Sequence, residues 1–392
     1  MSEKTLIPLS VPVIKGNEWQ YVKDCLDTGW VSSAGKYVNL FEERMAAYIG
    51  SKYAIACING TAALHISLLL AGVGSGDEVI VPTVTFIAPI NAVKYVGAEP
   101  VFMDCDAYLN MDPEKVAEFI KRECVYRRGE LINKKSKRRV KALIPVHVFG
   151  NPVNLEPLVG LAKKYKLAII EDATESLGSY YTAGRLAGKR TGAVGVLGCF
   201  SFNGNKIITT GGGGMIVTND GKLAAKARYL TTQAKDDEVK YVHHEVGYNY
   251  RLSNIPAALG VAQLEKIVEY IKTKRANYDR YRQSLKGVNG LVLIQEPDYG
   301  SSNYWFYSLL VEKRSYGRSN LELMGSLAAG NVQARPLWRP NHLQRPYRKN
   351  QAYRIENAVR YYGQLLNLPC SVDLGKEDIK RVVKVIRENG KK

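Results

Sequence analysis

Between Tyr53 and about Val217, short apolar runs alternate with longer segments of helical periodicity. Short continuous apolar runs are typical of strands buried on both faces of a parallel sheet. Strands that alternate with helices favour an α/β fold with helices on both faces. The predicted strands of this mostly parallel seven-stranded sheet are Ala54–Ile58, Val79–Val81, Val101–Met103, Ala142–Val148, Leu167–Ile170, Val196–Ser201 and Met215–Val217. The predicted helices include Glu18–Leu26, Val38–Ile49, Ala62–Ala71, Ile87–Tyr95, Pro113–Ile120 and Leu155–Tyr165.

The pattern changes after about Asn254. The elements predicted there are two long helices, one alternating strand and a final helix with a single apolar face: Ile255–Thr273, Lys274–Leu285, Tyr304–Val311 and Glu377–Glu388. A chain of 392 residues is too long for one small core. We therefore expect a large domain over residues 1–253 and a smaller C-terminal α+β domain over residues 254–392.

Lys206 is the first candidate for chemistry. It follows an apolar run and precedes the four glycines Gly211–Gly214. Glycines let the backbone approach a ligand closely and adopt positive φ. A lysine kept partly dry has a lowered pKa, so its free amine can attack a carbonyl. An ordinary turn that carries a lysine explains this segment equally well.

Asp172 is the second candidate, because it directly follows the predicted strand Leu167–Ile170. Sheets of this class bind their ligands at the carboxyl ends of the strands. A carboxylate there can hold a protonated pyridine nitrogen, and a lysine with an aspartate is the pairing that pyridoxal 5'-phosphate (PLP) requires. Taken alone, Asp172 is equally well read as a helix N-cap.

A phosphate site is predicted at Asn59-Gly-Thr61, where a strand turns into a helix. The helix start offers free backbone N–H groups and a positive dipole end to a phosphate. Thr61 adds a hydroxyl, and Ser201 can supply another. A simple helix cap is the usual meaning of such a turn.

Together these segments resemble the DegT/DnrJ/StrS class of sugar-nucleotide aminotransferases, which are fold type I PLP enzymes. The resemblance runs from about Ile7 to near the C-terminus. The motifs that carry it, in the family's order, are Gly60-Thr-Ala-Ala-Leu-His65, Gly76-Asp-Glu-Val-Ile-Val-Pro82, Glu171-Asp-Ala173, Ser201-Phe-Asn-Gly-Asn-Lys206 and Gly247-Tyr-Asn-Tyr-Arg-Leu-Ser-Asn254. Thr28–Ser33 and Asn203–Gly211 are most similar to the branch that aminates UDP-4-keto-6-deoxy-N-acetylhexosamines, as in the legionaminic acid and bacillosamine routes.

The resemblance implies a role for each matching residue. Lys206 is implied to form the Schiff base with PLP and then to move the proton, and Asp172 to pair with the ring nitrogen. Glu175 is implied to lie near the phenolic oxygen, where many relatives carry Gln, and Phe86 to stack on the ring. By position alone, a core aromatic is the favoured reading of Phe86. Thr61, Ala62 and Ser201 are implied to hold the phosphate.

Other implied roles involve a second subunit and the substrates. Asn249 is implied to reach the phosphate of the neighbouring subunit's cofactor, so the resemblance predicts a homodimer with shared active sites. Arg251 and Arg335 are weaker candidates for substrate anions, and a solvated arginine is the favoured reading of both. Many relatives have Thr-Gly-Glu-Gly-Gly after the lysine, whereas Gly211–Gly214 here lacks that carboxylate.

The implied reaction moves an amino group from an amino acid, with glutamate expected, to the 4-keto carbon of a nucleotide-linked 6-deoxy sugar. PLP cycles with pyridoxamine 5'-phosphate, and the 4-amino sugar serves surface polysaccharide or nonulosonic acid biosynthesis. A PLP- or pyridoxamine-dependent sugar dehydratase on the same fold is the nearest alternative. In relatives that dehydrate, the lysine position is typically histidine, so Lys206 favours transamination.

A net charge of +18 raises the alternative of a nucleic-acid-binding regulator on a transaminase fold. The basic residues cluster in Lys121–Arg128 and Lys134–Lys141, which we interpret as a solvated loop or helix-end insertion. No recognition helix or zinc finger accompanies them. We therefore expect no nucleic acid as partner, and a positive field suits capture of a diphosphate substrate.

The remaining composition excludes other classes. At 46% hydrophobic and 23% charged residues the chain has the composition of a soluble globular protein. Its apolar stretches are too short to span a bilayer, and residues 1–8 lack an export signal. The six cysteines and five histidines show no metal-ligand spacing, so we expect no metal and a reducing, cytoplasmic location.

Overall fold

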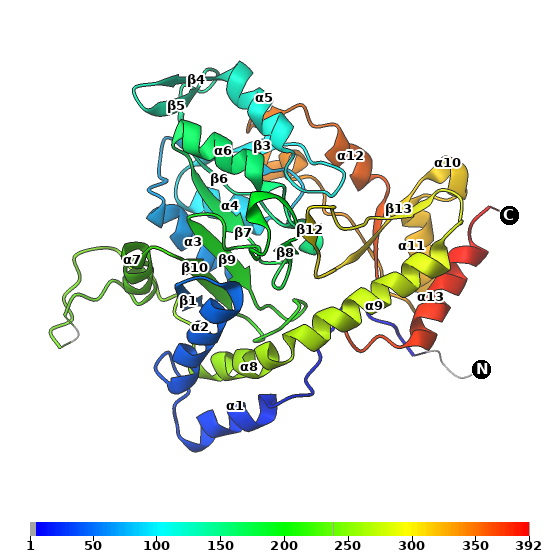
Figure 1. The fold of residues 1–392 in the computed structure, drawn as a ribbon, viewed down its shortest axis with the longest axis horizontal. Helices are drawn as coiled ribbons and strands as arrows, with labels where there is room; N and C mark the ends of the chain where they lie inside the picture. The colour runs from blue at the N-terminus through cyan, green and yellow to red at the C-terminus, as the bar shows by residue number, and fades with distance from the viewer. Residues whose placement is uncertain (1–4, 238, 392) are drawn as a thin grey trace.

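A large mixed sheet forms the centre of the protein, in a computed structural model that describes residues 5–237 and 239–391 (Figure 1). Its strands follow the order β1 (Tyr53–Cys57), β10 (Gly214–Thr218), β9 (Leu197–Ser201), β7 (Ala168–Asp172), β6 (Arg139–Leu143), β2 (Asp77–Pro82), β3 (Glu99–Met103) and β15 (Ala352–Tyr353). The pairs from β9 to β15 are parallel, and β10 is antiparallel to both of its neighbours. Six of the seven predicted strands agree closely with observed ones, whereas the strand predicted at Ala142–Val148 lies earlier, at Arg139–Leu143. The α/β fold is confirmed.

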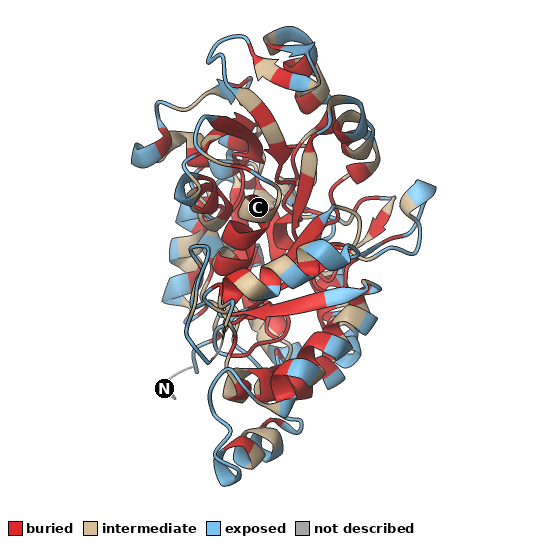
Figure 2. Ribbon diagram, turned by 90° about the vertical axis from the view of Figure 1, so that its left-hand side faces the viewer, coloured by how far each residue is buried: buried red, intermediate tan, exposed pale blue. Residues whose placement is uncertain are grey.

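Helices cover both faces of this sheet, because alternate strand residues enter two different apolar clusters. Val79 and Val81 of β2 pack in one cluster, whereas Ile80 packs in the other. Figure 2 shows the strands as the most continuously buried elements. The helices of this part are α2 (Lys36–Ile49), α3 (Gly60–Leu70), α4 (Ala88–Tyr95), α5 (Pro113–Glu123), α6 (Leu155–Tyr165) and α7 (Gly221–Thr231), preceded by α1 (Glu18–Asp27). Short 3-10 turns lie at η1 (Val148–Gly150) and η2 (Gly184–Leu186).

The basic segment predicted as a solvated loop or helix-end insertion contains a β-hairpin that directly follows α5. Strands β4 (Cys124–Arg127) and β5 (Glu130–Asn133) pair with each other, and β5 also pairs in antiparallel register with the first residues of β6. The two strands were not predicted because charged side chains hide the alternation of this exposed hairpin, in which only Cys124, Leu131 and Asn133 are buried.

The C-terminal part contains a second sheet, which is antiparallel. Its order is β11 (Leu291–Leu293), β13 (Tyr307–Val311), β16 (Leu365–Leu368) and β14 (Arg335–Pro336). The remaining elements are α8 (Asn254–Glu265), α9 (Ile267–Leu285), α10 (Lys313–Tyr316), α11 (Asn320–Ala329), η3 (Asn341–Leu343), η4 (Arg345–Tyr347), α12 (Asn357–Tyr362), α13 (Lys376–Glu388) and the small pair β8 (Tyr180–Tyr181) with β12 (Gly300–Ser301). The predicted helix break at residues 273–274 lies instead at Lys266, and the strand begins only at Tyr307, since Tyr304 has a φ of 48°.

Several contacts cross the expected domain boundary at residues 253–254. Helix α8 packs against α1 and α2, β15 extends the large sheet, and the backbone of Ile7 pairs with Val332. Helix α9 runs from the large sheet to the small one (Figure 1). The C-terminal strand β15 thus joins the large sheet, and the N-terminal residue Ile7 joins the C-terminal part. The division at residues 253–254 stays a prediction.

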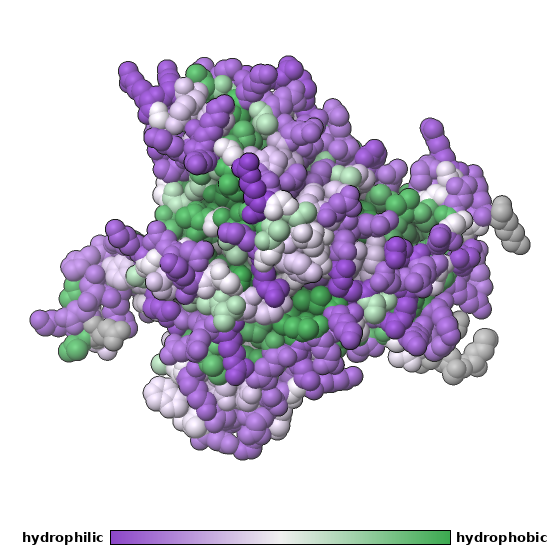
Figure 3. Space-filling view, viewed as in Figure 1, coloured by the Kyte–Doolittle hydropathy of each residue, from purple (hydrophilic) through white to green (hydrophobic). Residues whose placement is uncertain are grey.

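No helix within residues 5–237 and 239–391 is long and apolar enough to cross a bilayer. The same residues contain no group of three His, Cys, Asp or Glu side chains that could hold a metal ion. Polar and charged residues predominate on the face shown in Figure 3.

Candidate active site

A cavity of about 690 Å³ lies between the carboxyl edge of the large sheet and the small sheet. Seven of the ten predicted site residues line it: Thr61, Phe86, Asp172, Glu175, Ser201, Lys206 and Arg335. Asp172 and Ser201 are the last residues of β7 and β9, so the parallel strands bring them to the same edge. Ala62, Asn249 and Arg251 do not line the cavity.

Lys206 is presented by a closed loop between β9 and β10. Backbone hydrogen bonds from Phe202 N–H to Gly213 O and from Thr210 N–H to Phe202 O, both 2.8 Å, close this loop. Lys206 Nζ lies 3.9 Å from Glu175 Oε1 and 4.0 Å from the centre of the Trp305 ring. Burial lowers the pKa of the Lys206 ammonium, and the charges of Glu175 and Asp172 oppose this effect. Burial therefore favours the free amine that a nucleophilic lysine needs.

Asp172 is buried and held in place by its own backbone. Its N–H donates to Pro145 O at 2.9 Å, its carbonyl accepts from His147 N–H at 3.1 Å, and its Oδ1 accepts from Thr174 N–H at 3.1 Å. Burial raises the pKa of Asp172, while the Thr174 hydrogen bonds and the charge of Lys206 lower it. A buried carboxylate aimed into the cavity is ready to pair with a cationic ring nitrogen.

Glu175 lies one turn beyond Asp172 and shares the buried site. Its Oε2 accepts a hydrogen bond of 2.9 Å from Phe149 N–H. Burial raises the pKa of Glu175 to about 7, although Lys206 acts in the opposite direction. Two carboxyl groups therefore face a single lysine, and near neutral pH Glu175 can exist with or without its proton.

Glu171 and His147 anchor the end of the strand that carries Asp172, and no local sequence pattern indicated their roles. Glu171 is fully buried and accepts from Gly192 N–H at 2.8 Å and Val194 N–H at 2.6 Å. His147 Nδ1 accepts from Val153 N–H at 3.0 Å, so the ring proton is on Nε2, which donates to Glu171 at 3.0 Å. These bonds fix the end of β7 to the turn that leads into β9.

The predicted phosphate site is formed by the start of α3 and the end of β9. A Cβ added to Gly60 would lie 2.9 Å from Ser201 Cβ, so glycine is what lets the helix start approach Ser201. Ala62 was predicted to help hold the phosphate, but its N–H donates to Asn59 Oδ1 at 2.7 Å instead. The groups that face the cavity are therefore those of Gly60, Thr61 and Ser201, whose N–H and hydroxyl donors suit a phosphate.

Aromatic side chains form the opposite wall. Phe86 is 55% exposed, so the alternative of a core aromatic is wrong, and its ring meets that of Trp338 edge-on at 6.3 Å. Trp305 and Trp338 come from the C-terminal part and line the same cavity. The sequence missed both tryptophans, since nothing local links them to Lys206. Stacking of Phe86 on a ligand ring stays a prediction.

Arg251 has neither of its predicted roles. It forms a buried ion pair with Glu42 of α2, and Glu42 also pairs with Arg228 at 2.8 Å. It is therefore neither solvated nor available to a substrate, and we do not carry it into the site. Asn249 is exposed, and its backbone pairs with Thr232. Arg335 is exposed and lines the cavity. This position is compatible both with a solvated arginine and with a contact to a substrate anion.

The position of the missing carboxylate, Gly212, also faces the cavity. A Cβ added there would meet nothing within 4 Å. The site therefore has room for the side chain that many relatives carry, and its absence leaves the cavity wider at this point.

These features fit PLP. A buried amine lies beside a buried aspartate, and a helix start that only glycine allows offers donors for a phosphate. When bound, PLP supplies an aldehyde for the lysine and a ring that accepts electrons from the neighbouring carbon. The fold and this site define a PLP-dependent enzyme of the aminotransferase type.

The chain belongs to the DegT/DnrJ/EryC1/StrS aminotransferase family, whose sequence profile matches residues 12–387. It is 39% identical to a GDP-perosamine synthase of Caulobacter vibrioides, over 98% of each chain. It is 37% identical to EpsN of Bacillus subtilis, described as a pyridoxal phosphate-dependent aminotransferase, over 97% of this chain and 95% of that one. A crystal structure of a family member from Brucella abortus matches with a TM-score of 0.84 at 29% identity, covering 96% of both chains.

The protein is therefore a PLP-dependent sugar aminotransferase. The UDP-N-acetylhexosamine branch predicted from the sequence stays a prediction, and the Caulobacter relative is a GDP-perosamine synthase.

Proposed function

We propose that the enzyme moves an amino group from L-glutamate to the 4-keto carbon of a nucleotide-linked 6-deoxy sugar. The observation that carries this proposal is the buried Lys206 amine, set between Glu175 and Asp172 at the edge of the sheet. The resulting 4-amino sugar would serve polysaccharide biosynthesis.

Each residue of the site has a task in this proposal. The free Lys206 amine would take a proton from the substrate carbon and return it to the neighbouring carbon of the bound group, since this amine lines the cavity. Asp172 keeps the ring nitrogen protonated. Thr61 and Ser201 would hold the phosphate, while Trp305 and Phe86 line the cavity with apolar surface that limits the entry of water.

The nucleotide is best proposed as GDP. The sequence resemblance favours a UDP-linked N-acetylhexosamine, whereas the Caulobacter relative makes a GDP-linked amino sugar and matches over 98% of each chain. The net charge of +18 suits either diphosphate, because a positive field raises the capture rate of anions. The dehydratase alternative is disfavoured by Lys206, and the regulator alternative by membership of an aminotransferase family.

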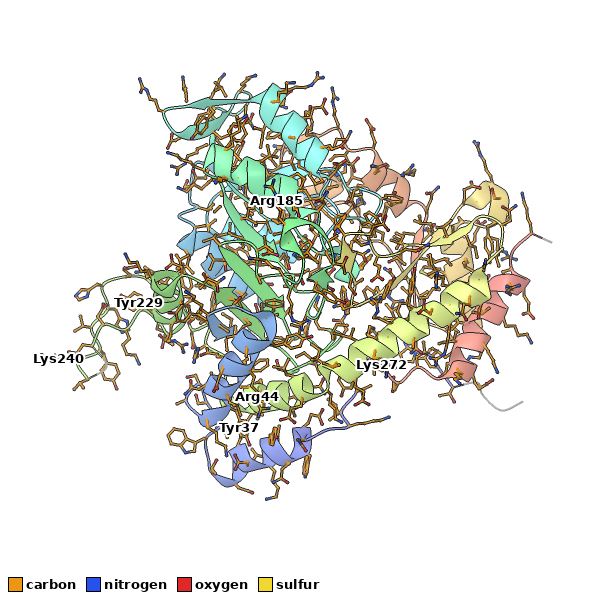
Figure 4. All side chains as sticks on the ribbon, viewed as in Figure 1. Tyr37, Arg44, Arg185, Tyr229, Lys240 and Lys272 are labelled. Atoms are coloured by element: carbon orange, nitrogen blue, oxygen red, sulfur yellow. The ribbon has the colours of Figure 1, made fainter. Side chains whose placement is uncertain are left out.

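A homodimer with shared active sites is part of the proposal. Residues 232–237 and 239–250 form an arm that projects from the body, with Tyr229 at its base and Lys240 near its tip (Figure 4). Val239 and Val246 on this arm are 86% and 80% exposed, which suits a surface covered by a second subunit. Asn249 belongs to the arm and lies outside its own chain's cavity, so its predicted phosphate contact requires the partner. A cytoplasmic location agrees with the free thiols of all six described cysteines.

The test is a substrate panel. Purified holoenzyme is incubated with isotopically labelled L-glutamate and UDP-, dTDP- or GDP-linked 4-keto-6-deoxy sugars, and the products are identified by mass spectrometry. Transfer of labelled nitrogen to the GDP-linked sugar in preference to the others is expected. Label in no sugar, or a dehydrated product, would contradict the proposal.

A further inference from the structure

A polar row crosses the small sheet on the side of the cavity. In the pairing of β14 with β16, Arg335 lies opposite Asn367, and in the pairing of β16 with β13, Asn367 lies opposite Ser308. Residues directly opposite each other share a face of the sheet, so these three side chains form one continuous row. Arg335 and Asn367 both line the cavity that contains Lys206.

The inner two members of this row are buried in apolar strands. Asn367 is 3% and Ser308 4% exposed, and the other residues of β16 are all leucines. A polar pair at such positions costs stability unless its hydrogen-bonding groups are used. Packing alone would be better served by another leucine, so the pair points to a ligand.

Ser308 fixes how the Asn367 amide is turned. Its hydroxyl donates to Asn367 Oδ1 at 2.7 Å. The acceptor of the amide is thereby engaged, and the Nδ2 donors have no hydrogen-bond partner among the residues that the structure describes. Arg335 has only donors, one of which bonds Ala334 O at 3.1 Å, and no ion pair of Arg335 is found within residues 5–237 and 239–391. Toward the cavity the row therefore presents two kinds of donor, the Asn367 amide N–H and the Arg335 guanidinium.

Two neighbouring donors, one of them charged, suit an anionic acceptor such as a carboxylate or a phosphate better than a neutral sugar hydroxyl. We propose that Asn367 and Arg335 bind a carboxylate of the amino-acid donor, with Ser308 as the positioning residue. This inference rests on the proposed function. A carboxylate is favoured over the diphosphate because Asn367 is nearly inaccessible, which suits a short amino acid inside the cavity.

The experiment separates the two half-reactions of the holoenzyme. Bleaching of the bound cofactor by L-glutamate reports the first, and recovery of its colour with the nucleotide-linked keto sugar reports the second. The variant Asn367→Asp keeps the shape and the Ser308 hydrogen bond but replaces the donor by a negative charge. Ser308→Ala leaves the donor in place and removes only what orients it.

For Asn367→Asp we expect kcat/KM for glutamate to fall about 100-fold, and for Ser308→Ala about 3-fold, through KM rather than kcat. The rate of the second half-reaction with the keto sugar should stay within about 2-fold in both. Asn389→Asp makes the same substitution elsewhere in the C-terminal part, where the amide bonds Val385 O, and should leave both half-reactions unchanged.

Two results would overturn the inference: a loss confined to the keto sugar, which would place the diphosphate on this row, or equal losses in both half-reactions, which would mean a purely structural role. If Asn367→Asp fails to fold, the change in KM for glutamate in Ser308→Ala is the deciding measurement, and an unchanged KM would overturn the inference. Failure of the proposed function is distinguishable, because the unaltered enzyme would then fail to bleach with glutamate or to recolour with any keto sugar.

Discussion

Lys206 Nζ lies 3.9 Å from Glu175 Oε1, which is within reach of electrostatic attraction but beyond a hydrogen bond. Both groups are buried, and burial disfavours the charged form of each. The protonation states of the two groups are therefore coupled. The charge of Glu175 influences what fraction of Lys206 is present as the free amine.

This relationship predicts a pH-dependent stability. The pKa of Glu175 is raised from 4.5 to about 7, so between these values the folded enzyme binds more protons than the unfolded chain, and stability falls as pH rises through this window. Glu175→Gln keeps an acceptor for Phe149 N–H and removes this cost. At pH about 8 the cofactor-free variant should be more stable than the unaltered protein by about 1–3 kcal/mol, with the advantage lost below pH about 4.5. Thermal unfolding at the two pH values measures this, and an advantage equal at both would contradict it.

Lys206→Ala should abolish catalysis without unfolding the protein. Turnover is expected to fall by more than about 1000-fold, because both the covalent attachment point and the proton carrier are lost. The visible absorbance of the attached cofactor should disappear, while circular dichroism stays unchanged. Lys189→Ala, at an exposed lysine, is the matched control. Near-normal turnover of Lys206→Ala would refute the assigned role.

Arg251→Met should affect stability and leave substrate binding alone. Breaking a buried ion pair costs about 3 kcal/mol, and here Glu42 keeps Arg228 as a second partner, so a loss of about 1–3 kcal/mol is expected. Urea unfolding measures the loss, with Arg44→Met as control, because that arginine forms a more exposed pair with Glu265 and should cost less than about 1 kcal/mol. A higher KM for either substrate at unchanged stability would restore Arg251 to the substrate site.

Asn249→Ala tests the shared active site. In the variant, cofactor affinity should fall about 10-fold through loss of a hydrogen bond to a charged group. Mixed dimers with one Asn249→Ala and one Lys206→Ala subunit decide where the effect lies. If Asn249 serves the partner, the altered asparagine faces the site that already lacks its lysine, and the remaining active site should bind cofactor normally. Weakened binding in that active site would show that Asn249 acts within its own chain.

The sequence predicted most of the large sheet because several of its strands contain buried apolar runs, such as Val79–Val81 in β2. It misplaced β6, because Arg139 and Lys141 interrupt the apolar pattern there. It missed Ala352–Tyr353, since two residues carry no periodic signal. It also placed the helix break at residues 273–274, whereas the chain turns at Lys266 inside a stretch of continuous helical pattern.

The same contrast holds for the site. Asp172 and Ser201 were found because they lie at or just beyond the ends of predicted strands, and strand ends meet at one edge of a sheet. Lys206 was found because it stands between an apolar run and a run of glycines. Trp305 and Asn367 were not found, because they come from the C-terminal part of the chain and only tertiary packing brings them to the cavity that contains the lysine. The role of Arg251 was misjudged because its partner, Glu42, is more than two hundred residues away in the chain.

The pairing of Ala352–Tyr353 with β3 has a consequence for biosynthesis. On the ribosome, the edge of the large sheet stays open until residue 353 has emerged, long after the other strands are available. The backbone groups of β3 are then exposed to unintended strand partners for much of translation. Truncated chains that end before residue 352 should therefore aggregate even though they contain every residue of the cofactor site.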